Sequence, residues 1–164
     1  MEEKIELKAV SIKPPEGVQL ILGQSHFIKT VEDLYETLIT SSPSIKFGVA
    51  FCESSGPALV RFDGNDEELI RAAVEYAYTV AAGHFFVVTL KNSYPINVLN
   101  RIKMLDEVAN IFCATGNSVK VILAETEQGR GVLGVVDGIS SKGVEDHKEK
   151  EKRLKFLRDI GYKR

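Results

Sequence analysis

The segment from Ile45 to Cys52 restricts the fold most strongly, because it is apolar at nearly every position except Lys46. A strand with one face in water alternates apolar and polar residues, whereas a continuous apolar run of this length is typical of a strand covered on both faces. Such a strand needs packing layers above and below it. The sequence therefore predicts a sheet with helices on its faces.

Two amphipathic segments can supply the covering layers. In residues 30–39 and 66–81, apolar side chains recur every three or four positions, as they do on the buried face of a helix. Asp66 is the expected N-cap of the second helix. The alanines on its apolar face would let the sheet approach closely, and we expect Gly83 to supply the left-handed residue that ends the helix.

Further strands are expected around these helices. Alternating or apolar runs mark them at residues 5–12, 18–22, 58–62, 84–90, 108–114, 119–124 and 132–136. The first two flank a Pro-Pro-Glu-Gly turn and are predicted to form a hairpin, as are the last two. Helices combined with such hairpins predict a single α/β domain over residues 1–164, with a mixed β-sheet.

Composition narrows the class of protein. The chain has 164 residues, of which 44% are hydrophobic and 27% charged, as expected for a folded domain with its own core. Its net charge of −2 argues against a nucleic-acid-binding domain, which would be basic. No apolar run approaches the roughly 18 residues of a membrane span, and no signal segment opens the chain. We expect a cytoplasmic protein without nucleic-acid or membrane partners.

Residues 145–164 are predicted to form a charged C-terminal helix. Acidic and basic residues are interleaved along it, which favours a solvated helix over a basic helix that binds nucleic acid or membrane. Leu154, Leu157 and Ile160 form one narrow apolar stripe. We therefore expect this helix to dock along a single edge.

The metal-ligating residue types are sparse. Cys52 and Cys113 lie in apolar runs and are expected to be buried free thiols, and no C-x-x-C pair is present. The three histidines, His26, His84 and His147, are not spaced as a metal cluster. No metal site is predicted from these residues.

A glycine-rich stretch, Gly129 to Gly134, satisfies the pattern G-x-G-x-x-G. In a dinucleotide-binding fold this pattern joins a strand to a helix, but here it joins two predicted strands. The lysine, H-R-D and D-F-G motifs of protein kinases are missing, as is the G-x-x-x-x-G-K-[ST] phosphate loop. Two interpretations stay open: a hairpin turn, or a turn whose bare backbone approaches an anion beside Arg130.

His84 has the best location for chemistry among the histidines. It follows Gly83 at the junction between a helix and a strand, and an imidazole can act as a general base, a metal ligand or a nucleophile that carries a phosphoryl group. Asp137 ends the strand after the glycine-rich turn, and Glu125 and Glu127 flank that turn. These carboxylates could hold Mg²⁺ with a phosphate, although their spacing specifies no metal.

Long blocks of the sequence resemble one known family. The blocks are Phe51-Cys52-Glu53-Ser54-Ser55-Gly56-Pro57, Asp63-Gly64-Asn65-Asp66, Ala82-Gly83-His84, Tyr94-Pro95-Ile96-Asn97-Val98-Leu99-Asn100, Ile111-Phe112-Cys113-Ala114-Thr115, Ala124 to Gly131 and Gly134 to Gly138. On these residues the chain resembles the archaeal and bacterial adenosine-specific kinases over nearly its whole length. The resemblance implies a three-layer α/β/α sandwich that assembles as a homo-oligomer, a trimer.

The resemblance also implies a ligand and a chemistry. It implies binding of adenosine and AMP rather than ATP, and a histidine that is found phosphorylated. His84 is the candidate because it alone among the histidines lies in a family block.

Two hypotheses follow. In the first, His84 is the nucleophile of an adenosine or AMP phosphotransferase; the residues expected to bind the ligand are Glu53, Asn97, Asn100, Gly129, Arg130, Gly131 and Asp137. Arg130 and the glycine amides would neutralise phosphate, the two asparagines would bind base or ribose, and the two carboxylates would meet a hydroxyl or Mg²⁺.

In the second hypothesis, the protein is a non-catalytic adenosine or AMP sensor, which the missing ATP motifs favour.

Overall fold

The computed structural model describes residues 2–164. The strands are β1 (Glu6–Ile12), β2 (Gln19–Ser25), β3 (Lys46–Cys52), β4 (Val60–Gly64), β5 (Phe85–Lys91), β6 (Val108–Thr115), β7 (Val119–Glu125) and β8 (Arg130–Asp137). The helices are α1 (Thr30–Ile39), α2 (Glu67–Val80), α3 (Pro95–Lys103) and α4 (His147–Asp159). The predicted α/β class is confirmed.

The strands form two sheets. Five strands pair in the order β4-β3-β5-β2-β6, and three pair in the order β1-β7-β8. Every strand pair among the described residues is antiparallel, so the expected mixed sheet is absent from this part of the chain.

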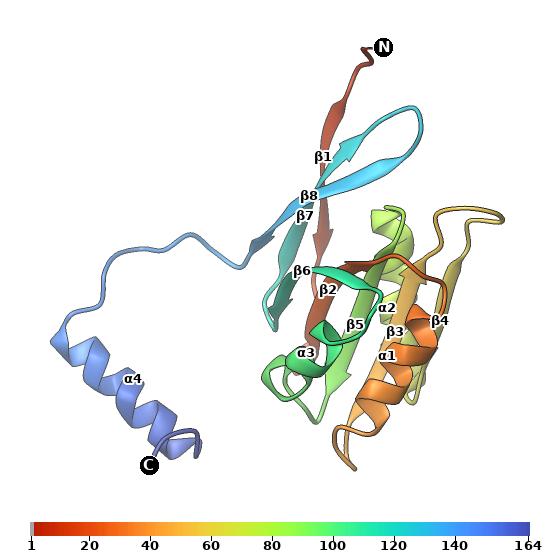
Figure 1. Ribbon diagram of the computed structural model, residues 1–164. Helices are drawn as coiled ribbons and strands as arrows, with labels where there is room; N and C mark the ends of the chain where they lie inside the picture. Colours follow the sequence, from red (N-terminus) through yellow and green to blue (C-terminus); the bar gives the residue numbers. More distant parts are fainter. Residues whose placement is uncertain (1) are drawn as a thin grey trace.

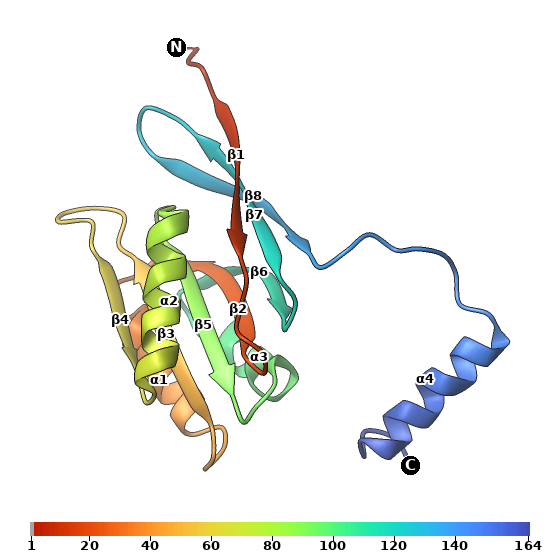
Figure 2. The same cartoon turned by 180° about the vertical axis from the view of Figure 1, so that it is seen from behind.

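The five-stranded sheet is the middle layer of the molecule (Figures 1 and 2). On β3, Phe47, Val49 and Phe51 point into a core shared with α1 and α3. Ala50 and Cys52 point the other way, into a core shared with α2 and the three-stranded sheet. Because both faces are covered, β3 is buried from Phe47 to Cys52, as its apolar run predicts.

The predicted hairpin of β1 and β2 is wrong. β1 pairs instead with β7, from Glu6 opposite Glu125 to Ile12 opposite Val119, while β2 lies between β5 and β6 in the other sheet. Alternation predicts a strand but says nothing about its partner. Ile12 packs with buried residues of β7, so burial of that side chain stabilises the long-range pairing of β1 with β7.

The helix α2 lies close against the five-stranded sheet, as its alanines predict. The Asp66 carboxylate accepts hydrogen bonds from the backbone amides of Glu68 and Leu69, each 3.1 Å long, and so caps the helix. A Cβ atom at Gly48 would lie 2.4 Å from the backbone of Leu69, so only glycine fits β3 to the helix there.

The chain leaves the layered body after β8. An extended segment carries α4 away from both sheets, as Figures 1 and 2 show from opposite sides. The helix has no buried residue. Among the described residues, no helix combines the length and apolarity that crossing a bilayer requires.

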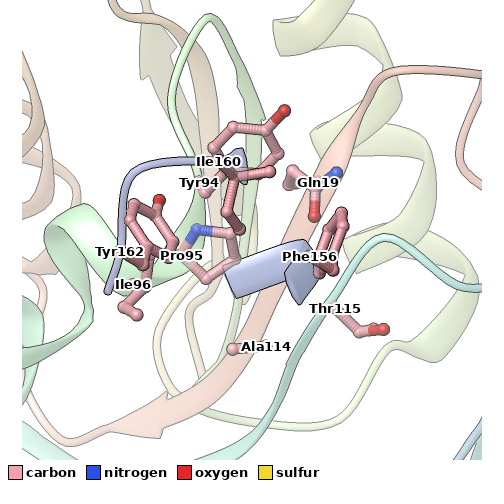
Figure 3. Close-up of a pocket in the computed structure, with 9 residues that line it drawn as sticks. All are labelled: Gln19, Tyr94, Pro95, Ile96, Ala114, Thr115, Phe156, Ile160 and Tyr162. Atoms are coloured by element: carbon pink, nitrogen blue, oxygen red, sulfur yellow. The ribbon is translucent and has the colours of Figure 1, made fainter. Parts of the chain in front are cut away.

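The end of this arm faces the body across a cavity of about 490 Å³. Figure 3 shows Phe156, Ile160 and Tyr162 of the arm around the same space as Tyr94 and Ile96 at the start of α3. All five side chains are substantially exposed. The C-terminal arm, residues 138–164, therefore presents apolar surface that the body of its own chain leaves uncovered.

Candidate functional site

His84 lies at the junction between α2 and β5, where two residues adopt left-handed backbone conformations. Ala81 follows the helix with φ 49°, and His84 itself has φ 64°. The expectation that Gly83 ends the helix in this conformation is wrong, because Ala81 does so. A left-handed conformation is uncommon for a residue with a side chain and persists only where the surroundings enforce it.

Three contacts hold His84, two through its imidazole and one through its backbone. Its Nε2 atom lies 2.6 Å from the Ser54 hydroxyl, at hydrogen-bonding distance. Its ring stacks on Phe51, with centroids 5.8 Å apart and planes inclined by 13°. Its backbone amide donates to the Cys52 carbonyl over 2.8 Å. All three contacts come from β3 and the residues just after it, so strand pairing in the sheet positions the imidazole.

Gly83 is needed for the approach of Ser54. A Cβ atom at Gly83 would lie 2.8 Å from Cβ of Ser54, closer than side-chain atoms pack. The glycine that the sequence singles out therefore makes room for the bond between Ser54 and His84 and does not form the helix end.

A cavity of about 470 Å³ lies in front of this pair, where the β7–β8 hairpin approaches the loop after β3. It is lined by Glu53, Ser54, Ala81, Gly83, Ala124, Thr126, Gln128, Gly129, Arg130 and Gly131. Four predicted ligand-binding residues are thus brought together from segments far apart in the chain. We call this space the phosphate cavity, after the anion that the sequence predicts there.

Arg130 is firmly held at the edge of the phosphate cavity. Its Nε donates to Glu125 over 2.8 Å, and its Nη1 donates to the carbonyls of Thr79 and Val80, over 3.1 and 3.2 Å, at the end of α2. Hydrogen bonds from Lys8 and Arg130 hold the pKa of Glu125 below its ordinary value. Nη2 has no hydrogen-bond partner among residues 2–164, which leaves a donor for an anion.

Gly129 and Gly131 expose bare backbone to the phosphate cavity. A Cβ atom at either position would meet nothing within 4 Å, so internal packing does not require these glycines, although Gly129 has φ 159° and donates its amide to Thr126 Oγ1 over 3.3 Å. Their lack of side chains instead keeps this side of the cavity open. The stretch is thus the predicted hairpin turn, closed by the Thr126 amide on the Gly129 carbonyl over 2.9 Å, and its open side leaves room for an anion.

Glu53 lines the phosphate cavity but already has partners. Its carboxylate accepts the Leu59 amide over 3.0 Å and both of its oxygens accept from the Arg61 guanidinium, over 3.0 and 3.1 Å. The bond from Leu59, followed by the effect of Arg61, lowers the pKa of Glu53. The ionised Glu53 side chain therefore holds together the loop between β3 and β4. It could contact a ligand only while keeping its bonds to Leu59 and Arg61.

Three predicted ligand residues lie elsewhere. Asn97 caps α3, where its Oδ1 accepts the Tyr94 amide over 2.9 Å. Asn100 lines a different surface hollow. Asp137 accepts hydrogen bonds from Thr115 and Asn117 at the far end of β8, over 2.8 and 3.1 Å. The phosphate cavity of this chain contains none of the three.

Sequence reasoning missed Ser54 and Thr126 as members of the site. Ser54 lies in the polar loop that follows the buried strand β3, a position where functional side chains often gather. That signal alone does not separate Ser54 from Ser55 next to it. Only the contact with His84 makes the distinction.

Comparisons with known proteins place the chain in a family. The sequence matches the family described as adenosine specific kinase over residues 10–163. The crystal structure of the PH1918 protein from Pyrococcus horikoshii OT3 matches with a TM-score of 0.94 and 46% sequence identity, over 98% of this chain and 99% of that one. A search of curated proteins found no match. With the family matched over nearly the whole sequence, the chain belongs to the adenosine-specific kinases.

Proposed function

We propose that this protein binds adenosine or AMP and transfers a phosphoryl group, which His84 carries as phosphohistidine. The observation that carries the proposal is the phosphate cavity, where Arg130 and the backbone of Gly129 and Gly131 converge in front of the bond between Ser54 and His84. Phosphoryl transfer depends mainly on positioning and on neutralising charge. A fixed guanidinium beside an open glycine-rich turn provides both.

Labelling with a radioactive phosphoryl donor tests the role of His84. Wild type should incorporate acid-labile phosphate, and His84→Ala should lose it. His147→Ala is the matched control, because His147 is an exposed histidine on α4. Equal labelling of the wild type and His84→Ala would rule out phosphohistidine at this position.

A non-catalytic adenosine or AMP sensor is the second candidate. Two observations favour it: the sequence lacks known ATP motifs, and most donors of Arg130 are already engaged. Calorimetry with adenosine, AMP, ADP and ATP, run beside the labelling assay, separates the two functions. Tight binding of adenosine and AMP without labelling by any donor would favour the sensor.

The proposed reaction is compatible with one cofactor, a Mg²⁺ ion bound to the phosphate. Glu53 is the carboxylate of the cavity lining, and its oxygens already accept from Leu59 and Arg61. Mg²⁺ usually keeps several water ligands and binds through substrate phosphates. The phosphate and water would therefore supply most of its ligands here.

We also propose that the protein assembles as a homotrimer, in which the C-terminal arm of each chain contacts another copy. In support, α4 has no buried residue, and Phe156, Ile160 and Tyr162 are substantially exposed. A relative matches 98% of this chain at a TM-score of 0.94, so the arm and the body keep a similar arrangement in a second protein. Contacts with another copy would hold the arm in that position and cover its apolar side chains.

A further inference from the structure

The Ser54 hydroxyl lies between His84 and the phosphate cavity. Ser54 is a lining residue, whereas among residues 2–164 the lining does not include His84. The distance of 2.6 Å between Ser54 Oγ and His84 Nε2 makes this hydroxyl the link from the imidazole to the cavity. A hydroxyl in hydrogen-bonding contact with a histidine is the usual arrangement of a nucleophile and its base.

The surroundings are built around this contact. Gly83 leaves the space that Ser54 occupies, and Phe51 stacks on the imidazole. His84 keeps its left-handed conformation while its amide bonds to Cys52. The Ser54 side chain has no other hydrogen-bond partner among the described residues, so its hydroxyl is committed to His84.

We propose that Ser54 is a second phosphoryl-accepting nucleophile of this site, with His84 as its general base. The inference rests on the proposed function, in which the phosphate cavity receives a phosphoryl group, and it takes a nucleoside triphosphate as the donor. It adds a modification site and a catalytic role for a residue that the sequence does not single out.

The step balances with the groups at hand and the named donor. Ser54 Oγ attacks the terminal phosphorus of the nucleoside triphosphate, and the new O–P bond forms as the bond to the bridging oxygen breaks. The electron pair of the broken bond leaves on the nucleoside diphosphate. The Ser54 proton moves to His84 Nε2, and the resulting imidazolium returns it to solvent.

The phosphate cavity supplies the charge stabilisation that this step needs. Arg130, the backbone around Gly129 and Gly131, and Thr126 line the same space as Ser54. Donors fixed before the reaction stabilise developing negative charge without reorganising. His84, behind Ser54, is the group that can take the proton.

The two acceptors give chemically distinct products. Phosphohistidine is lost in acid and survives in base, whereas phosphoserine survives acid and is lost in base. While Nε2 accepts the Ser54 proton it cannot itself carry the phosphoryl group. Acid and base stability of the label therefore identify which of the two atoms attacked the phosphorus.

A fluorophosphonate probe tests the reactivity of Ser54 without requiring the natural donor. In that reaction Oγ attacks phosphorus, fluoride leaves with its electron pair, and the proton passes through Nε2 to solvent. Mass spectrometry should map the label to Ser54 in the full-length wild-type chain. The neighbouring Ser55, whose side chain makes no hydrogen bond to His84 in residues 2–164, is the control within the same molecule.

Variants make the test specific. Ser54→Ala should remove the label, and Ser55→Ala should leave it unchanged. His84→Gln should slow labelling by about 100-fold, as expected for loss of a general base. Thermal unfolding of each variant shows whether it is folded.

The outcomes separate the two proposals. Labelling of Ser54 no faster than that of Ser55 in folded wild type would overturn the inference, and so would labelling in folded His84→Gln at the wild-type rate. If the chain still binds AMP and forms phosphohistidine, the proposed function stands without the serine nucleophile. If Ser54 reacts but neither adenosine nor AMP binds, the proposed function fails and the activated serine remains.

Discussion

Arg130 donates a hydrogen bond to the carbonyl oxygen of Val80, 3.2 Å away, and thereby ties the β7–β8 hairpin to the last turn of α2. The last carbonyls of a helix have no partner within the helix, so an arginine is well suited to satisfy them. The same residue lines the phosphate cavity. Arg130 is thus both a structural link between the β7–β8 hairpin and α2 and a cation in the lining of the phosphate cavity.

Replacing Arg130 by lysine should separate these roles. Lysine keeps the charge but cannot form the guanidinium's several directed bonds, so we expect a loss of about 1 kcal/mol in stability. AMP affinity should fall about tenfold or more while adenosine affinity changes little, because only AMP carries phosphate. Calorimetry with both ligands measures the difference. Arg153→Lys on α4 is the control, and an equal loss for both ligands would contradict a phosphate role.

Gly131→Ala should affect ligand binding without affecting folding. The added methyl group meets no atom within 4 Å in the chain, so the free energy of unfolding should stay within about 0.5 kcal/mol of wild type. The methyl group would occupy the edge of the phosphate cavity and lower AMP affinity about tenfold.

Gly134→Ala provides the matched control for that substitution. Gly134 lies on the same strand, also has open space at its Cβ position, and does not belong to the lining of the phosphate cavity. Its replacement should leave AMP affinity unchanged. Similar AMP binding by both alanine variants would show that the ligand does not contact this part of the hairpin.

Glu107 should make stability depend on pH. It is 1% exposed, and among the described residues no N–H or O–H group donates a hydrogen bond to either of its carboxylate oxygens. Burial, followed by contact with Asp33, raises the pKa of Glu107 above its ordinary value of 4.5. Burial alone would raise the pKa of Asp33, but its interactions with Glu107 and Lys29 outweigh burial and lower that pKa. In this pair Asp33 ionises first and Glu107 keeps its proton to higher pH.

The sign of the effect follows from the raised pKa. Between pH 4.5 and the raised value the folded chain holds a proton that the unfolded chain releases, so the contribution of Glu107 to stability is lost as the pH rises. Glu107→Gln should flatten this dependence and stabilise the protein at pH 7 by about 1 kcal/mol. Urea unfolding at several pH values measures it, with the exposed Glu36→Gln as control. A wild-type stability that rises steadily over this range would contradict the assignment.

Removing the C-terminal arm after Gly138 should reduce the oligomer to a monomer. The body keeps its sheets and both cores without the arm, because no residue of α4 belongs to either core. Light scattering during gel filtration measures the mass, and circular dichroism checks the fold. Phe156→Glu should weaken assembly in the same way, whereas Tyr78→Glu, at an exposed aromatic of α2, should not. A full-length chain that is monomeric would contradict the proposed contact.

Neither cysteine should react in the folded protein. Burial raises the pKa of Cys52 and of Cys113 to about 12, so almost no thiolate exists at pH 8. Iodoacetamide should modify both only after unfolding, which provides the positive control. Rapid alkylation of native Cys113 would show that the end of β6 opens readily.

The sequence by itself determined the elements and much of the core. The apolar run of β3, the capped and alanine-rich α2, and the hairpin around Gly129 are all present, because burial and capping act over a few residues. The bounds of the strands agree closely with the periodic pattern. The family blocks also pointed to His84 and to the glycine-rich turn.

Only the tertiary structure decided which of these elements meet. β1 pairs with β7 and not with β2, and that pairing brings Arg130 to the end of α2. Strand partners depend on burial and hydrogen bonding summed over distant segments, which no local pattern records. The same packing placed Ser54 against His84. It also gave Gly83 a different role from the expected one, because the missing side chain of Gly83 leaves room for Ser54.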